Sequence, residues 1–133
     1  MADSANVTMV KRFYDIADGK IEADPAELFT EDVSVYTPRS GIVSGLDGLA
    51  GASKVRALYR QITHNYGEFG IVEHGDRVIV EGTTAGETVT GLTWDGRKDI
   101  AGHFCAVYDF RDGLISRMYV YYDPDLGHGD ADR

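Results

Sequence analysis

Three side chains in this 133-residue chain have the types needed for acid–base chemistry on a small molecule: His103, Asp123 and Tyr14. A carboxylate beside an imidazole fixes the tautomer of the ring and raises its basicity, so His103 and Asp123 can act as an acid–base dyad. Tyr14 can donate a hydrogen bond to a ligand carbonyl. Each has a structural alternative. The first two can form a cross-strand polar pair at a rim or in a dimer contact, and Tyr14 can belong to the core with its hydroxyl at the edge.

The dyad depends on how the last two strands pair. A period-two pattern predicts strands over residues 100–110 and 114–123, joined by a tight Asp-Gly turn. If Asp109 and Arg117 form an ion pair across this hairpin, the same register brings the two dyad residues opposite each other. The odd-numbered residues then share one face, and the more apolar even-numbered residues share the other. A slip of one residue or a β-bulge would reverse the two faces.

Helical patterns come before these strands. Apolar residues at helical spacing predict a first helix that ends at Ala17, and Asp24 followed by proline predicts a short second one. The spacing of later apolar residues predicts a third helix over residues 49–66, whose last turn holds His64. We interpret this histidine as a partner of the helix dipole, with catalysis as the alternative. Further strands are predicted over residues 33–37, 69–73 and 78–90, and this order is typical of an α+β domain.

Composition narrows the classes of partner. The 22 acidic and 13 basic residues give a net charge of −9, which repels nucleic acids and anionic lipid surfaces. No window approaches the roughly 18 apolar residues that a membrane span needs, and the N-terminus lacks a signal peptide, so we expect a cytoplasmic protein. The four histidines and the one cysteine lack metal-ligand spacing, and the glycines form no phosphate cradle. We therefore expect neither a metal nor a cofactor.

Four segments together resemble one known family: Lys11-Arg12-Phe13-Tyr14, residues 26–33, residues 45–51 and the closing stretch FRDGLISRMYVYYD. In their order and spacing the chain is similar to the SnoaL-like branch of the nuclear-transport-factor-2-like (NTF2-like) superfamily. The resemblance implies an α+β cone in which three N-terminal helices pack on a strongly curved, mixed or antiparallel sheet that encloses a cavity. It fits one domain over residues 1–124, followed by an acidic flexible tail over residues 125–133. It also implies homodimers formed through the outer face of the sheet.

The resemblance also suggests which residues meet a ligand, because it places the even-numbered face of the last hairpin on the cavity wall. The ligand-binding residues implied in this way are Thr37, Phe104, Ala106, Tyr108, Met118, Val120 and Tyr122. Ketosteroid isomerases of the superfamily carry a catalytic aspartate where this chain has Thr37, and an aspartic acid where it has Ala106. The Arg-x-Asp pair of the epoxide hydrolases aligns with Gly82-Thr83-Thr84. Neither of these two mechanisms is therefore expected here.

The expected function is that of a SnoaL-like enzyme, a cyclase, isomerase or dehydratase, which uses cofactor-free acid–base chemistry on a small apolar oxygenated substrate. His103 would be the acid–base group, Asp123 the carboxylate that orients it and Tyr14 the hydrogen-bond donor. The alternative is a non-catalytic ligand-binding or dimerisation module that kept the cone after losing the carboxylates.

Overall fold

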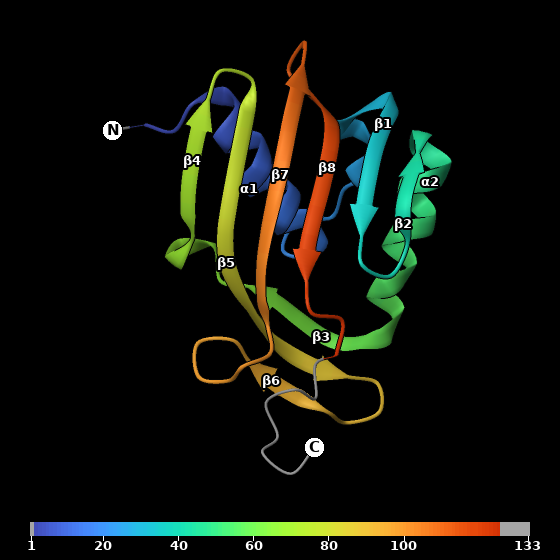
Figure 1. Cartoon of the computed structure of the whole chain (residues 1–133), viewed down its shortest axis with the longest axis vertical. Helices are drawn as coiled ribbons and strands as arrows, with labels where there is room; N and C mark the ends of the chain where they lie inside the picture. The colour runs from blue at the N-terminus through green and yellow to red at the C-terminus, as the bar shows by residue number, and fades with distance from the viewer. Residues whose placement is uncertain (1, 126–133) are drawn as a thin grey trace.

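A strongly curved β-sheet forms the wall of a cone, as the computed structural model shows for residues 2–125 (Figure 1). Eight strands in this part of the chain pair in the order β2-β1-β8-β7-β5-β3, with β4 and β6 also paired to β5. The strands are β1 Phe29–Thr37, β2 Gly41–Ser44, β3 Tyr59–His64, β4 Gly70–His74, β5 Arg77–Thr88, β6 Thr93–Asp95, β7 His103–Arg111 and β8 Leu114–Tyr122. Since β1 runs parallel to β8 and the other neighbours are antiparallel, the sheet is mixed.

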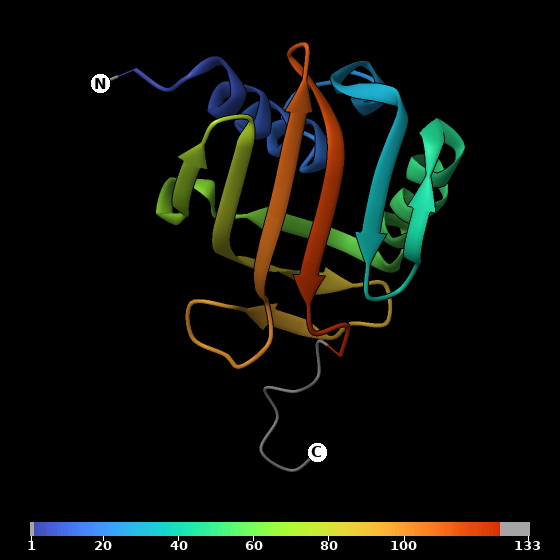
Figure 2. The ribbon, with the colours of Figure 1, turned by 45° about the horizontal axis from the view of Figure 1, so that its top comes forward.

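The bend of the sheet comes from the long strand β5. Its first part, up to Thr83, pairs with β4 and β7, whereas the part from Thr84 onwards pairs with β3 and β6. Gly86 lets β3 cross closely, because a Cβ atom on it would lie 2.1 Å from the carbonyl oxygen of Gln61. The end of β5 therefore turns away from the main sheet, and β3, which pairs with it, passes behind β7 and β8 in Figure 2.

The register predicted for the last hairpin is confirmed. Asp109 lies opposite Arg117, and Cys105 lies opposite Tyr121. A register shift does occur, but it follows Asp109 at the turn end of the hairpin, so it leaves the faces of the remaining pairs unchanged. The even-numbered residues of β7 are buried and the odd-numbered ones are half-buried or exposed.

Helix α1, Ala5–Ala17, agrees with the predicted first helix and lies behind β5 and β7 (Figure 2). Ser4 caps it by accepting a hydrogen bond from the backbone N–H of Val7 at 3.1 Å. Val10 and Tyr14 are buried on the face turned toward the sheet. The helix thus closes the concave side of the cone and ends at Asp18, whose backbone N–H bonds the last carbonyls.

The prediction of three N-terminal helices is wrong. Residues 2–125 contain two α-helices, α1 and α2 (Gly45–Ser53), and the predicted second helix is a 3-10 helix, Pro25–Leu28. The predicted third helix breaks into α2, a 3-10 helix, Lys54–Leu58, and strand β3. The four-residue spacing of apolar side chains suggested one helix, but pairing with β5 places the second half in the sheet, so tertiary contacts outweigh local spacing.

The core fills the space between α1 and the sheet. The largest fully buried side chains in the described chain are Tyr108, Ile115, Val10, Val33, Val35, Val78 and Val80. Neither α-helix in residues 2–125 is long and apolar enough to cross a membrane. The tail predicted over residues 125–133 lies, apart from Asp125, outside the described residues.

Candidate functional site

The concave side of the sheet encloses a cavity of about 430 Å³, a size typical of sites for small molecules. Most of its lining is aromatic or aliphatic, and α1, β3, β7 and β8 all contribute side chains. The single tryptophan, Trp94, is among them, and its indole Nε1 donates a hydrogen bond to Thr84 Oγ1 at 2.9 Å. The walls suit an apolar molecule with few polar groups.

The structure places most of the implied ligand-binding residues on this wall. Those that line the cavity are Thr37, Phe104, Tyr108, Met118, Val120 and Tyr122. Ala106 is fully buried in the hydrophobic core. Thus the even-numbered face of the hairpin points inward as the register requires, and contact of these residues with a ligand stays a prediction.

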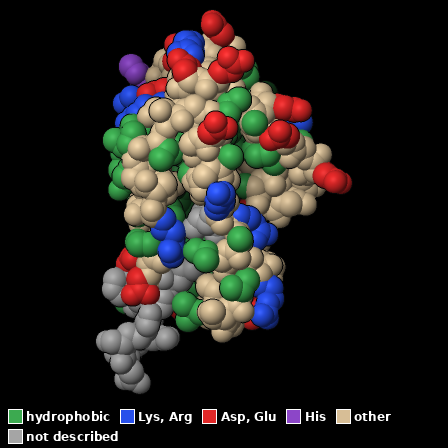
Figure 3. All heavy atoms as spheres, turned by 90° about the vertical axis from the view of Figure 1, so that its right-hand side faces the viewer, with side chains coloured by type: hydrophobic (Ala, Val, Ile, Leu, Met, Phe, Trp, Pro, Cys, Tyr) green, Lys and Arg blue, Asp and Glu red, His purple; other side chains and the backbone are tan. Residues whose placement is uncertain are grey.

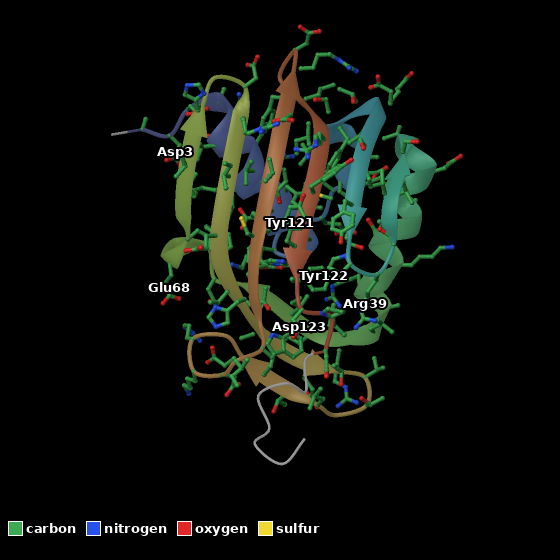
Figure 4. The ribbon with its side chains drawn as sticks, in the orientation of Figure 1. Asp3, Arg39, Glu68, Tyr121, Tyr122 and Asp123 are labelled. Carbon is green, nitrogen blue, oxygen red and sulfur yellow. The ribbon has the colours of Figure 1, made fainter. Side chains whose placement is uncertain are left out.

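His103 and Asp123 both border the cavity, where both are exposed. Nε2 of His103 lies 3.2 Å from the backbone carbonyl of Asp99, and Oδ1 of Asp123 accepts a hydrogen bond from the N–H of Asp125 at 2.9 Å. Figure 4 shows Asp123 just beyond the lower end of β8. The two residues lie at the rim, and their role as a dyad stays a prediction.

A second histidine–carboxylate pair lies deeper, between Asp18 and His64. The carboxylate of Asp18 contacts Nδ1 of His64 at 2.5 Å through Oδ1, and accepts the backbone N–H of His64 at 2.7 Å through Oδ2. The Asp18 side chain is 1% exposed, whereas that of His64 is 19% exposed and lines the cavity. A neutral ring that donates from Nδ1 to the carboxylate would leave Nε2 as an acceptor. No residue in the range 2–125 hydrogen-bonds Nε2.

The prediction that His64 lies in the last turn of a helix is wrong. His64 is the last residue of β3, and Asp18 is the C-cap of α1, 46 positions earlier in the chain. In the sequence, the two residues are visible only as an aspartate at the predicted end of the first helix and a histidine much later in the chain. These two residue types carry no information about contact, because only the folded chain brings the end of α1 against the end of β3.

Tyr14 lies beside this pair, with its ring centroid 4.8 Å from that of His64. The hydroxyl of Tyr108 donates to the hydroxyl of Tyr14 at 2.7 Å. Burial raises the pKa of both tyrosines, so both hydroxyls stay protonated at neutral pH. The Tyr14 proton has no acceptor among the described residues, and Tyr14 lines the cavity, so the proton is available to an oxygen atom of a ligand.

The site therefore combines an imidazole, a carboxylate that orients it and a phenol donor in an apolar space. Phe104 and Phe69 surround the group, with ring centroids 5.7 Å from His64 and 5.2 Å from Tyr14, respectively. Low local polarity strengthens each hydrogen bond to a bound ligand. Among residues 2–125 we find no group of three or more acidic, histidine or cysteine side chains that could hold a metal ion.

Solved structures of low sequence identity share this fold. A protein from Xanthomonas campestris pv. campestris described as a "putative polyketide cyclase" is 17% identical, with a TM-score of 0.77 over 95% of this chain and 97% of its own. An NTF2-like protein of unknown function from Burkholderia pseudomallei is 18% identical, with a TM-score of 0.73 and coverage of 91% and 92%. TerC, co-crystallised with polyporic acid, is 21% identical, with a TM-score of 0.73 and coverage of 94% and 96%. These likenesses show the fold.

A match to a family model completes the comparison. No curated protein sequence matches the chain. The model of the SnoaL-like domain matches residues 10–118, a range that contains Tyr14, Asp18, His64 and Tyr108. The match covers most of the chain and agrees with the resemblance seen in the sequence. Its fold is shared with solved NTF2-like proteins. The protein belongs to the SnoaL-like domain family.

Proposed function

We propose that this protein is a SnoaL-like enzyme of the cyclase, isomerase or dehydratase type, which transfers protons within a small, largely apolar oxygenated substrate bound in the cavity. The observation that carries the proposal is the buried Asp18 carboxylate against Nδ1 of His64, a residue that lines the cavity. A carboxylate that is almost fully buried beside a histidine in a cavity is the arrangement that general-base catalysis needs.

The proposed steps use only side chains of this chain. Nε2 of His64 takes a proton from the carbon next to a substrate carbonyl, while Tyr14 donates a hydrogen bond to the carbonyl oxygen as it gains negative charge. Asp18 stabilises the imidazolium that forms, and Tyr108 supports the Tyr14 hydroxyl. Return of the proton to another atom of the same molecule gives isomerisation, and attack of the enolate on a second carbonyl gives ring closure.

Two named neighbours are consistent with this substrate class, although at their identities they share only the fold. One is described as a "putative polyketide cyclase", and another, TerC, was crystallised with polyporic acid. Both names refer to oxygenated organic molecules. The alternative of a non-catalytic binding module needs the same cavity, but it gives no reason for a buried carboxylate held against a histidine.

Kemp elimination of nitrobenzisoxazole tests the proposal without knowledge of the natural substrate. In this reaction a base removes the single ring C–H proton, the N–O bond breaks, and the coloured cyanophenolate appears. We expect turnover by the wild-type protein and a loss of about 100-fold or more in His64→Gln, since a positioned general base contributes about that much. His103→Gln is the matched control, because His103 is the other histidine that lines the cavity and lies at its rim.

The two histidine variants separate the candidate sites. If His103→Gln loses the activity and His64→Gln keeps it, the rim pair His103–Asp123 is the base and the deeper pair is structural. If the wild-type protein accelerates the reaction no more than free imidazole does, the enzyme proposal fails and the binding module becomes the better account.

We also propose that the protein is a homodimer and acts in the cytoplasm. The outer face of the sheet carries a cluster of tyrosines, in which the ring centroid of Tyr36 lies 5.7 Å from that of Tyr119 and 5.3 Å from that of Tyr121. Tyr121 is 46% exposed, and Cys105 beside it is half-buried. We expect light scattering to give twice the monomer mass at micromolar concentration, and Tyr121→Glu to give the monomer mass. A monomeric wild-type protein would contradict the dimer.

A further inference from the structure

Positively charged side chains gather at the end of the cavity that is remote from Asp18 and His64. Tyr59 and His64 are the first and last residues of β3, so their backbones lie about 15 Å apart along the cavity. Arg56 lines the cavity next to Tyr59, and its Nη1 donates to the Tyr59 carbonyl at 3.0 Å. The cavity thus has a polar end near Tyr59 and a catalytic end near His64.

Arg39 reaches the same end from the loop after β1. Its Nη2 donates to the carbonyl of Pro124 at 2.7 Å, which ties the loop to the segment after β8. Burial raises the pKa of Tyr122, whereas Arg39 and Thr37 lower it through their interactions with its hydroxyl. Figure 4 shows Arg39 and Tyr122 near the lower end of the sheet. Arg39 therefore lies beside a tyrosine that lines the cavity.

Both arginines act electrostatically on the Tyr59 hydroxyl. Burial raises the pKa of Tyr59, and Tyr122 adds to this rise, whereas Arg39 and Arg56 both lower it. The lining at this end thus contains Arg56, Tyr59, Tyr122 and the exposed carboxylate of Asp123, and Arg39 is anchored next to Asp123 by its bond to Pro124.

This positive end stands out against the charge of the whole protein, which is −9. Figure 3 faces the side of α2 and shows Lys and Arg side chains gathered in its lower half, with most Asp and Glu side chains above them. An anionic ligand would be repelled by the average surface and attracted only near such a patch. Guanidinium groups bind carboxylates with charge-assisted hydrogen bonds, which makes arginine suitable for this task.

Building on the function proposed above, we propose that the substrate is an elongated, ring-containing carboxylic acid. Arg39 and Arg56 bind its carboxylate at the mouth of the cavity, and its apolar body extends toward His64. One negative charge is favoured over a phosphate, because Asp123 already supplies a carboxylate to this end and a doubly charged group would meet its repulsion. The hydroxyl groups of Tyr59 and Tyr122 can donate further hydrogen bonds to the same carboxylate.

Binding of two matched probes tests this inference without any measurement of turnover. Naphthoate and the neutral naphthamide have nearly the same shape, and only the first carries a charge. The indole N–H of Trp94, the only tryptophan, gives one resolved NMR signal that reports on occupation of the cavity. We expect naphthoate to bind at least tenfold more tightly than naphthamide at low salt, and this difference to shrink as the salt concentration rises.

Variants assign the effect to the arginines. We expect Arg39→Gln and Arg56→Gln each to weaken naphthoate about tenfold, the loss typical of one charge-assisted hydrogen bond, and to leave naphthamide unchanged. Arg60→Gln is the matched control, because Arg60 has the same charge and directly follows Tyr59 on β3, but it pairs with Glu87 at 3.2 Å. An unchanged thermal melting curve shows that each variant is folded.

Three results would overturn the inference: equal binding of the two probes, an equal loss in the Arg60 control, or no Trp94 shift with either probe at millimolar concentration. The His64→Gln variant separates this inference from the catalytic proposal. If that variant keeps both naphthoate binding and Kemp turnover, only the catalytic proposal fails. If the arginine variants bind naphthoate normally while His64→Gln loses turnover, only the carboxylate inference fails.

Discussion

Replacing Asp18 with asparagine separates the catalytic role of the pair from its structural role. The Asp18 carboxylate is 1% exposed and accepts from both the backbone N–H and the ring of His64. The asparagine carbonyl can still accept the backbone N–H, so the change is confined to the ring, where a neutral hydrogen bond replaces the contact with the carboxylate. A hydrogen bond to a charged group contributes about 1.5–3 kcal/mol, and we expect the lower end of this range. Unfolding in urea should therefore show a decrease in free energy of about 1.5 kcal/mol.

The effect on proton transfer should be much larger. The asparagine NH₂ group presents a donor to Nδ1 of His64, which moves the ring proton to Nε2 and removes the base from the cavity side. We expect Kemp elimination to fall by about 100-fold or more in Asp18→Asn, as for loss of the base itself. The assay is the initial rate of cyanophenolate formation, measured on protein that circular dichroism shows to be folded.

Asp15→Asn is the matched control for this variant. Asp15 lies one turn earlier on α1, and its Oδ1 atom is buried without a hydrogen-bond partner. Its neutralisation should leave the Kemp rate unchanged and should not lower the free energy of unfolding, because an unpartnered buried carboxylate oxygen is replaced by a neutral amide. A folded Asp18→Asn protein with wild-type activity would refute the dyad, and an equal loss in Asp15→Asn would trace the effect to the charge of the helix.

Three further predictions follow from single contacts. Tyr14→Phe should slow Kemp elimination about tenfold and lower the free energy of unfolding by about 1–3 kcal/mol, because the buried Tyr108 hydroxyl loses its acceptor; kinetics and urea titration check both. Gly86→Ala should strongly lower the melting temperature, since its Cβ would meet a backbone oxygen at 2.1 Å; an unchanged melting temperature would contradict the tight strand crossing. The Arg77 guanidinium bonds both carboxylate oxygens of Asp109, at 2.7 and 2.9 Å, and holds the pKa of that carboxyl below its usual range. Because this pKa is lowered in the folded state, the ionised carboxylate stabilises the protein above the unfolded pKa of about 3.9, and this stabilisation is lost as the pH falls through the folded pKa. In urea titrations below pH ~4, Asp109→Asn should therefore lose less free energy of unfolding than the wild type, by up to about 1 kcal/mol.

The last hairpin shows how much a local pattern can predict. Alternation and an Asp-Gly turn predicted the two strands, and an ion pair between Asp109 and Arg117 gave their register. The choice of the inward face came from the family resemblance. The first helix was likewise predicted from spacing, a serine cap and its stop at Ala17. The family could be recognised because these features occur in a fixed order along the chain.

Strand β3 shows where local patterns fail. Its residues have apolar spacing that suits a helix, and only the bend of β5, with a glycine at the crossing, makes pairing in the sheet the better solution. The error moved His64 from the cavity wall to a helix end. The spacing of apolar residues reflects the preference of the isolated segment. In the folded protein, backbone hydrogen bonds with β5 stabilise the strand instead of the helix.

The sequence alone thus determined the family, the first helix, the closing hairpin and the apolar character of the cavity wall. Only the tertiary structure decided which polar groups meet there. Asp18 and His64 are 46 positions apart, and Arg39 and Arg56 lie on separate segments, so no periodicity links them. Each group comes together because the sheet bends around α1 and brings the ends of distant elements to one cavity, and that curvature is a property of the whole packed chain.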